Sequence, residues 1–188
     1  MKNRLVIATL ALATMTGVYS CKQEKKKETI KTVERNHEDH SSHEKKTRHK
    51  ETAGSITFKD DKINNAYGHY IHVKTALVNT DAKEAKNGAG MLIKALAEVE
   101  NGEKATDFAK KIEAADDVEK QRQAFSGLSG EFAKMVDGQI ASGTVYKQYC
   151  PMAFDFEGGY WLSSEEEIRN PYFGDKMLDC GEVKERLN

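Results

Sequence analysis

The chain has 188 residues, a formal net charge of −1, 31% charged residues and 38% hydrophobic residues. This length leaves room for one domain of ordinary size, together with residues that need not belong to it. The balanced charge gives no argument for a nucleic-acid partner or for acidic substrates. All six histidines precede Val73, whereas most aromatic residues lie from Phe125 onward. The two halves of the chain therefore carry different chemistry.

Residues 1–20 are expected to be a signal peptide. A basic start, Met1 to Arg4, precedes an apolar run from Leu5 to Val18 that is too short to span a bilayer. The run ends in Val-Tyr-Ser-Cys, which is similar to a lipoprotein signal-peptidase site and implies lipidation of Cys21. A plain secretory signal or an uncleaved anchor is the alternative. Because Lys22 follows rather than aspartate, we expect a lipid-anchored protein in a Gram-negative envelope, on the outer membrane and facing the periplasm.

Residues 21–55 are expected to form a disordered, charged tether. Apolar residues are almost absent from this segment, so it cannot bury enough apolar surface to offset the entropy lost on ordering. Histidine-rich tracts can bind Zn(II), Cu(II) or Ni(II) through neutral imidazole. In a flexible chain no fixed geometry selects a metal, and a solvated linker is the simpler interpretation. The histidines concerned are His37, His40, His43 and His49.

Residues 56–188 are expected to form a mainly α-helical domain. Apolar residues recur at three- and four-residue steps in four segments, which predicts three long amphipathic helices and a short one. The segments are Ile63–Val78, Ala82–Val99, Phe108–Ala115 and, opened by Asp116, Phe125–Val136. Asp60 or Asp61 and, before the second helix, Asp81 are suited to act as N-caps. Short connections between the helices indicate an up-and-down helical bundle.

A small β-hairpin cap is predicted after the helices. Polar and aromatic residues alternate in Tyr146–Phe156 and Tyr160–Leu162, on either side of a Gly-Gly pair. The serines and glutamates of residues 163–167 predict one short helical turn. The last residues, Val183–Asn188, are expected to fray.

Two cysteine and methionine pairs flank this cap. Cys150 lies two residues before Met152, and Met177 lies three residues before Cys180. Thiolate and thioether sulfurs are soft ligands that suit Cu(I), so a cap that gathers all four would form a copper site. In an oxidising compartment the two cysteines are equally suited to form a disulfide that closes the cap, with the methionines in the core. The residues leave both hypotheses open.

Other functional signals in the sequence are weaker. His69 and His72 lie one helical turn apart on the first predicted helix, so they form a possible metal pair, although such histidines are more often surface residues. The sequence offers no catalytic triad order, no paired catalytic carboxylates and no glycine-rich phosphate loop. We therefore do not expect an enzyme.

Several segments of the chain resemble the domain-of-unknown-function family DUF3347. These segments are Tyr149–Ala153, Trp161–Ser163, Ile168–Gly174, Met177–Gly181, Ala76–Val78 with Asp81, and the stretch from Arg122 to Ser129. The resemblance extends over roughly Ile63 to Val183. It implies kinship with domains attached to periplasmic adaptors of copper and silver efflux pumps. It therefore implies an envelope lipoprotein that buffers Cu(I), or delivers it to an efflux adaptor or another envelope protein.

The Cys-Pro-Met element is also similar to that of short heavy-metal-binding domains, in which histidine commonly follows. Here the next residue is Ala153, so the full metal site of those domains is not carried over to this chain.

Overall fold

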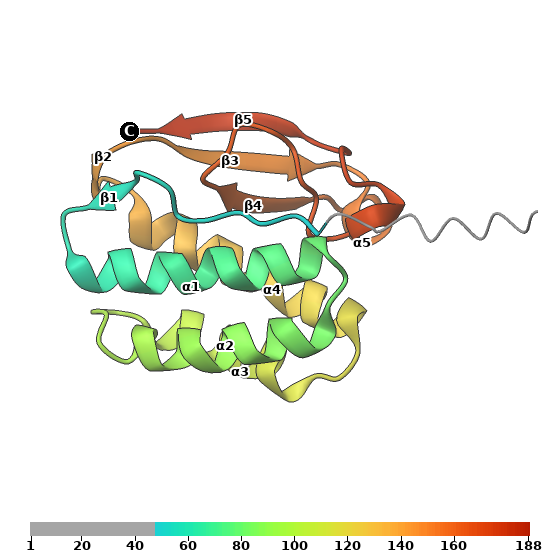
Figure 1. Ribbon diagram of the computed structural model, residues 1–188, viewed down its shortest axis with the longest axis horizontal. Helices are drawn as coiled ribbons and strands as arrows, with labels where there is room; N and C mark the ends of the chain where they lie inside the picture. Colours follow the sequence, from blue (N-terminus) through green and yellow to red (C-terminus); the bar gives the residue numbers. More distant parts are fainter. Residues whose placement is uncertain (1–47) are drawn as a thin grey trace, which may run out of the picture. The chain divides into compact units, whose positions relative to one another are not determined.

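The computed structural model describes residues 48–188, which fold into helices followed by small antiparallel sheets (Figure 1). The expected signal peptide, the lipidated Cys21 and three of the tether histidines, His37, His40 and His43, lie outside the described residues. Among residues 48–188, no helix has both the length and the apolar character needed to span a membrane. The prediction of a mainly helical domain with a C-terminal β element is confirmed at this level.

Four helices follow one another at the start of the domain. They are α1 (Asp61–Val78), α2 (Ala82–Leu96), α3 (Glu103–Ala114) and α4 (Val118–Val136). Asp60 and Asp81 cap the first two, because their carboxylates accept hydrogen bonds from the backbone N–H groups of Lys62 and Glu84. Each helix packs against the next one, and α4 also packs against α1. Each of the four predicted helical segments therefore corresponds to a helix of the structure.

The strands form two small sheets. A short pair joins β1 (Thr57–Phe58) to β2 (Ile140–Ser142), and a three-stranded antiparallel sheet has the order β4 (Gly159–Ser163), β3 (Val145–Cys150), β5 (Glu182–Leu187). Figure 1 shows α1 and α4 between this sheet and the α2–α3 pair. Contacts between α4 and β4 join the two layers.

The structure corrects three details of the predicted cap. The strand that begins near Tyr146 ends at Cys150, because Pro151 has no N–H to donate, and a short turn of helix, α5 (Ala153–Phe156), follows. No helical turn forms over residues 163–167; the short 3₁₀ helix η1 (Gly174–Lys176) comes later. The last residues do not fray, because β5 pairs with Val145–Tyr149 of β3.

Aromatic packing joins the helices to the sheet. The Tyr70 ring stacks on Phe125 and lies 4.6 Å from the Phe132 ring, centre to centre. Its hydroxyl accepts a hydrogen bond from the Leu162 N–H of β4 at 3.0 Å. The fully buried Trp161 donates its indole N–H to Gln148 on the neighbouring strand. These buried contacts fix β4 and β3 on the α1–α4 layer.

Residues 48–55, which we call the strap, lie on the domain although they were expected to belong to the tether. The Glu51 side chain is fully buried and forms an ion pair with Lys74 of α1. The backbone of His49 exchanges two hydrogen bonds with the Asn79 side chain. The strap is therefore docked on the helices by the buried Glu51 carboxylate and by the His49 backbone, although the predicted tether extended to residue 55.

Candidate functional site

The structure brings Cys150 and Cys180 together at one end of the three-stranded sheet. Cys150 ends β3 and is fully buried, whereas Cys180 is half-buried in the turn that precedes β5. Their sulfurs lie 2.9 Å apart, and both cysteines are free thiols. The turn is held by the Asn170 amide, which donates to the Cys180 carbonyl at 2.7 Å. The expected proximity of the two sulfurs is met, while their role as ligands stays a prediction.

The surroundings of this pair raise the pKa of the Cys180 thiol. The hydrogen bond with Cys150, followed by burial, raises the pKa of the Cys180 thiol to about 11. A catalytic or redox-active cysteine depends on a lowered pKa, because the thiolate is the nucleophile. A soft metal ion, in contrast, displaces the thiol proton when it binds.

The two methionines lie together in a neighbouring groove. Met152 and Met177 line it with aromatic side chains and with residues of α4, whereas neither cysteine lines it. The aromatic and α4 residues are Phe154, Phe156, Tyr172, Phe173, Glu119, Lys120 and Gln123. Met152 is 40% exposed, so its thioether is accessible to solvent. The four predicted ligands therefore form two separate pairs, the cysteines at the end of the sheet and the methionines in the groove.

Backbone strain is concentrated just after Cys150. Phe154, Asp155 and Phe156 all have left-handed backbone angles, with φ of 54°, 55° and 71°. Each such residue costs about 1–2 kcal/mol when it is not glycine. Phe156 is also 77% exposed, so burial of its ring does not repay that cost. Strain of this kind clusters at functional sites, and here it lies in the wall of the methionine groove, a few residues after Cys150.

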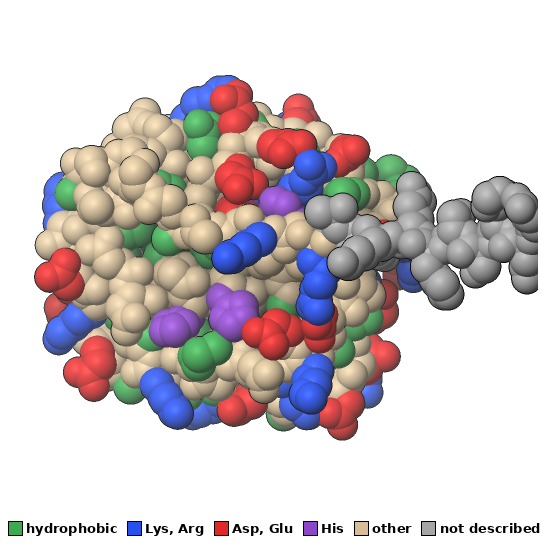
Figure 2. All heavy atoms as spheres, in the orientation of Figure 1, with side chains coloured by type: hydrophobic (Ala, Val, Ile, Leu, Met, Phe, Trp, Pro, Cys, Tyr) green, Lys and Arg blue, Asp and Glu red, His purple; other side chains and the backbone are tan. Residues whose placement is uncertain are grey.

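The other predicted pair, His69 and His72, lies on the part of α1 that faces α2. The Nε2 atom of His72 is 2.6 Å from a carboxylate oxygen of Glu84 on that helix. His69 is half-buried, and burial together with the nearby His72 lowers its pKa. Figure 2 shows histidine side chains scattered among charged ones on this face. His72 is thus already engaged by a carboxylate.

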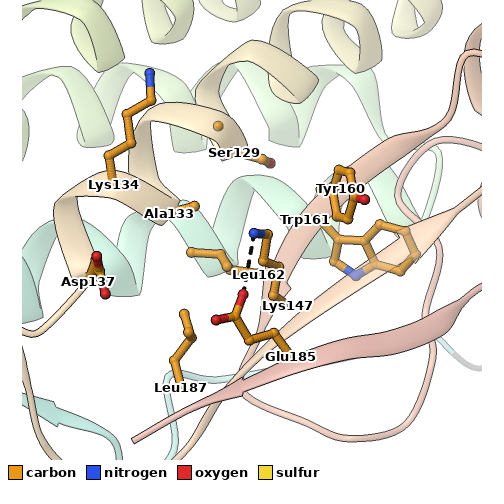
Figure 3. A pocket seen from close by; sticks show the side chains of 11 residues that line it. Ser129, Ala133, Lys134, Asp137, Lys147, Tyr160, Trp161, Leu162, Glu185 and Leu187 are labelled. Carbon is orange, nitrogen blue, oxygen red and sulfur yellow. Dashed lines mark hydrogen bonds and ion pairs between the residues drawn. The ribbon is translucent and has the colours of Figure 1, made fainter.

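A hollow between α4 and the three-stranded sheet was not predicted (Figure 3). Trp161 and Leu162 contribute its apolar wall, and the ion pair between Lys147 and Glu185, 3.4 Å apart, crosses it. It contains no thiol or imidazole group among its lining residues.

Sequence reasoning also missed a cluster around Glu51. This carboxylate accepts hydrogen bonds from the Ser163 hydroxyl at 3.1 Å and the Ser164 N–H at 2.7 Å, besides its ion pair with Lys74. Burial alone would raise the pKa of Glu51, but the charge of Lys74, together with hydrogen bonds that include the one from the Ser164 N–H, holds it below its ordinary value. The signal that could have revealed the cluster is Lys74 itself, a lysine on the buried face of α1.

Comparison with known proteins bears on the helical part of the domain. Residues 66–143 match the family described as "Protein of unknown function (DUF3347)". This region ends before Cys150, so the cysteine and methionine pairs lie beyond it. No curated protein and no solved structure matches the chain significantly. The family description names no activity or ligand, and the similarity to this family is confined to residues 66–143.

Proposed function

We propose that this protein binds one Cu(I) ion through the thiolates of Cys150 and Cys180. The observation that carries the proposal is the 2.9 Å separation of the two sulfurs. One sulfur comes from the end of a paired strand and the other from a hydrogen-bonded turn, so both are held at the same end of the sheet, and they would move apart when an ion binds between them. Two thiolates form a soft donor set, which selects a soft monovalent ion over a hard cation.

The methionines extend this donor set towards solvent. One residue separates Met152 from Cys150 in the chain. Met177 lies in the same turn as Cys180, and its carbonyl accepts a hydrogen bond from the Cys180 N–H. Their groove opens at the surface, so the thioethers are placed to receive Cu(I) or to complete its coordination. Because the pKa of the Cys180 thiol is raised and a bound ion must displace its proton, Cu(I) affinity should rise with pH.

The rest of the chain suits a carrier role in the envelope. Cys21 would anchor the protein to the membrane, and an up-and-down bundle of α1–α4 would support the metal-binding cap. The partner would be an efflux adaptor or another envelope protein that accepts Cu(I). The raised pKa of the Cys180 thiol favours a metal-binding role for this residue over a nucleophilic one.

A second candidate is an interaction module without metal, stapled by a Cys150–Cys180 disulfide. The complete burial of Cys150 favours this alternative, since an inaccessible sulfur exchanges metal slowly. In the chain-entropy model, a disulfide over a loop of 30 residues stabilises the fold by about 3–4 kcal/mol.

Thiol counting and Cu(I) competition on the mature protein separate the two candidates. For a copper carrier, the anaerobically purified protein has reactive thiols and takes one Cu(I) from a chromogenic chelator. The variants Cys150→Ser and Cys180→Ser should lose this ion. Met152→Leu and Met177→Leu should keep the fold, because the volumes match, yet bind more weakly.

Met91→Leu is the matched control, since Met91 is similarly exposed at 38% but lies on α2, away from the cap. A protein that binds no Cu(I) even when fully reduced would contradict the copper proposal and leave the stapled module.

A further inference from the structure

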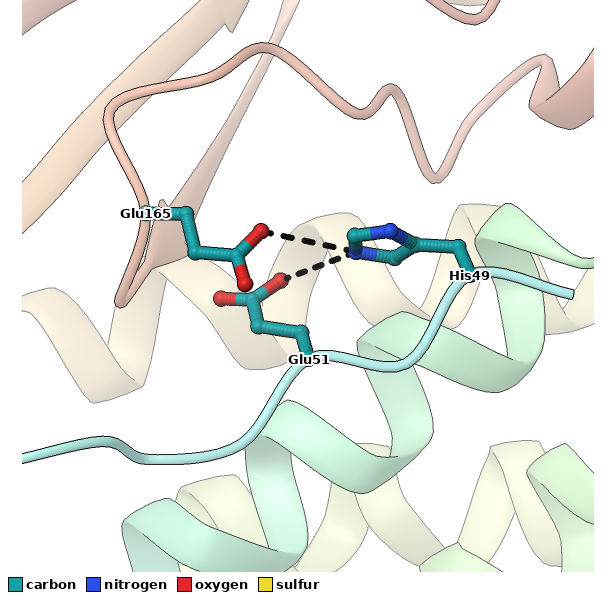
Figure 4. Close-up of side chains that lie close together, drawn as sticks. All are labelled: His49, Glu51 and Glu165. Atoms are coloured by element: carbon teal, nitrogen blue, oxygen red, sulfur yellow. Dashed lines mark ion pairs between the residues drawn. The ribbon is translucent and has the colours of Figure 1, made fainter.

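The imidazole of His49 has an unsatisfied nitrogen that faces two carboxylates. Its Nε2 atom is buried and has no hydrogen-bond partner. It lies 3.8 Å from a Glu51 oxygen and 3.7 Å from a Glu165 oxygen. These separations are too long for hydrogen bonds. Figure 4 shows both carboxylates directed at the same edge of the ring, and one atom from each of the three side chains lies within 4.8 Å of the others.

Neighbouring hydrogen bonds hold all three residues in place. The His49 backbone is clamped by the Asn79 side chain, at 2.9 Å and 2.8 Å. Glu51 is fixed by Lys74 and by the serines that end β4, and the N–H of Glu165 donates to the Ser163 hydroxyl at 3.1 Å. The arrangement is therefore built by the strap, α1 and the turn after β4 together.

The charges of the cluster leave room for a cation. Lys74 balances one carboxylate, so with a neutral imidazole the four groups carry one net negative charge. The side chains of Glu51 and Lys74 are fully buried, whereas that of Glu165 is 40% exposed. The open side at Glu165 gives an ion a path in and gives it water as a further ligand.

We propose that His49, Glu51 and Glu165 bind one divalent transition-metal ion of the Zn(II) class, at a site separate from the cysteine pair. Imidazole nitrogen and carboxylate oxygen are ligands of Zn(II), which in open sites takes three protein ligands and a water. Metal–ligand bonds of about 2.0–2.2 Å in a tetrahedral site place ligand atoms roughly 3.3–3.6 Å apart around the ion. The separations of 3.8 Å and 3.7 Å from Nε2 are slightly longer, so a bound ion would draw the three side chains closer together. The bound ion would fasten the strap to the domain.

Co(II) is the probe for this site, because its absorption spectrum distinguishes thiolate ligands from nitrogen and oxygen ligands. The full mature protein is stripped with chelator and titrated with Co(II). We expect one equivalent with visible ligand-field bands and without thiolate-to-cobalt charge transfer. His49→Ala and Glu165→Gln should each weaken this binding more than about tenfold, since each removes a ligand. Glu51 is left intact, because its loss would also strand the buried Lys74.

Matched variants exclude the other donors of the chain. Replacing His37, His40 and His43 together by alanine should leave the Co(II) spectrum and stoichiometry unchanged, as should Cys180→Ser. Circular dichroism checks the fold of each variant, and Glu165→Gln decides the result if His49→Ala does not fold. Unchanged Co(II) binding in Glu165→Gln would overturn the proposal. So would binding that disappears with the other three histidines or with Cys180, or no binding by the parent protein.

Discussion

Substituting Glu51 by glutamine should destabilise the domain far more than its place in a polar segment suggests. The change removes the negative charge that compensates Lys74, whose side chain is fully buried. The Lys74 ammonium then has only uncharged hydrogen-bond partners, such as the Ser163 hydroxyl. Breaking a buried pair in this way costs about 3–5 kcal/mol. For a domain of this size that is a drop in Tm of roughly 10–20 °C. Thermal and urea unfolding, followed by circular dichroism in the presence of chelator, measure both quantities.

Two further variants make this test specific. Glu165→Gln removes a neighbouring carboxylate that is 40% exposed, and it should cost less than about 1 kcal/mol. The double substitution Glu51→Leu with Lys74→Met removes both buried charges and should recover most of the loss. If Glu51→Gln is as mild as Glu165→Gln, the strap is not docked as described and the reasoning is refuted.

Three other predictions follow from buried contacts. Because the folded-state pKa of Glu51 is lowered, ionised Glu51 stabilises the domain at pH values above 4.5, the pKa of this carboxyl in the unfolded chain, and this stabilisation is lost as the pH falls. A free energy of unfolding that stays constant during an acid titration would contradict this. Arg122→Lys should lower the free energy of unfolding by about 2–4 kcal/mol, because the buried guanidinium donates to the carbonyls of Leu77 and Pro171 at once. Equal urea midpoints for the variant and the parent protein would exclude that role. Gly158→Ala should cost at least about 2 kcal/mol, since φ is +85° and the new Cβ would lie 2.1 Å from the Tyr149 hydroxyl; Gly138→Ala, with φ of +65° and open space, is the control for backbone strain alone.

The helices could be predicted because their signals are local. The apolar spacing of α1 and α2 and the capping carboxylates of Asp60 and Asp81 are all contained within a few residues. β5 could not be predicted in the same way, because its side chains mostly face solvent and its pairing partner lies far back in the chain. Contacts of Lys184 and Arg186 with tyrosine rings of β3 support that pairing, and they are visible only once the register is known.

Part of the candidate site could also be predicted from the sequence. The residue types and their compartment suggested that Cys150 and Cys180 meet, and the β3–β5 pairing brings them together. The sequence did not separate the methionines into their own groove, since that depends on the turn after Cys150. The docking of His49 and Glu51 was also not predicted, because their partners Asn79 and Lys74 lie more than 20 residues further along the chain; the apolar surroundings of Lys74 on its helix were the one signal for it.

Anaerobic Cu(I) titration of the fully reduced mature protein, against a competing chromogenic chelator, tests the central claim most directly. The parent protein is compared with Cys180→Ser, which removes the half-buried thiol without opening the core at Cys150. The account predicts that the parent protein binds one Cu(I) tightly and releases it as the pH falls, and that Cys180→Ser does not bind this ion. A parent that leaves all copper with the chelator, or a variant that retains the same ion, would contradict it.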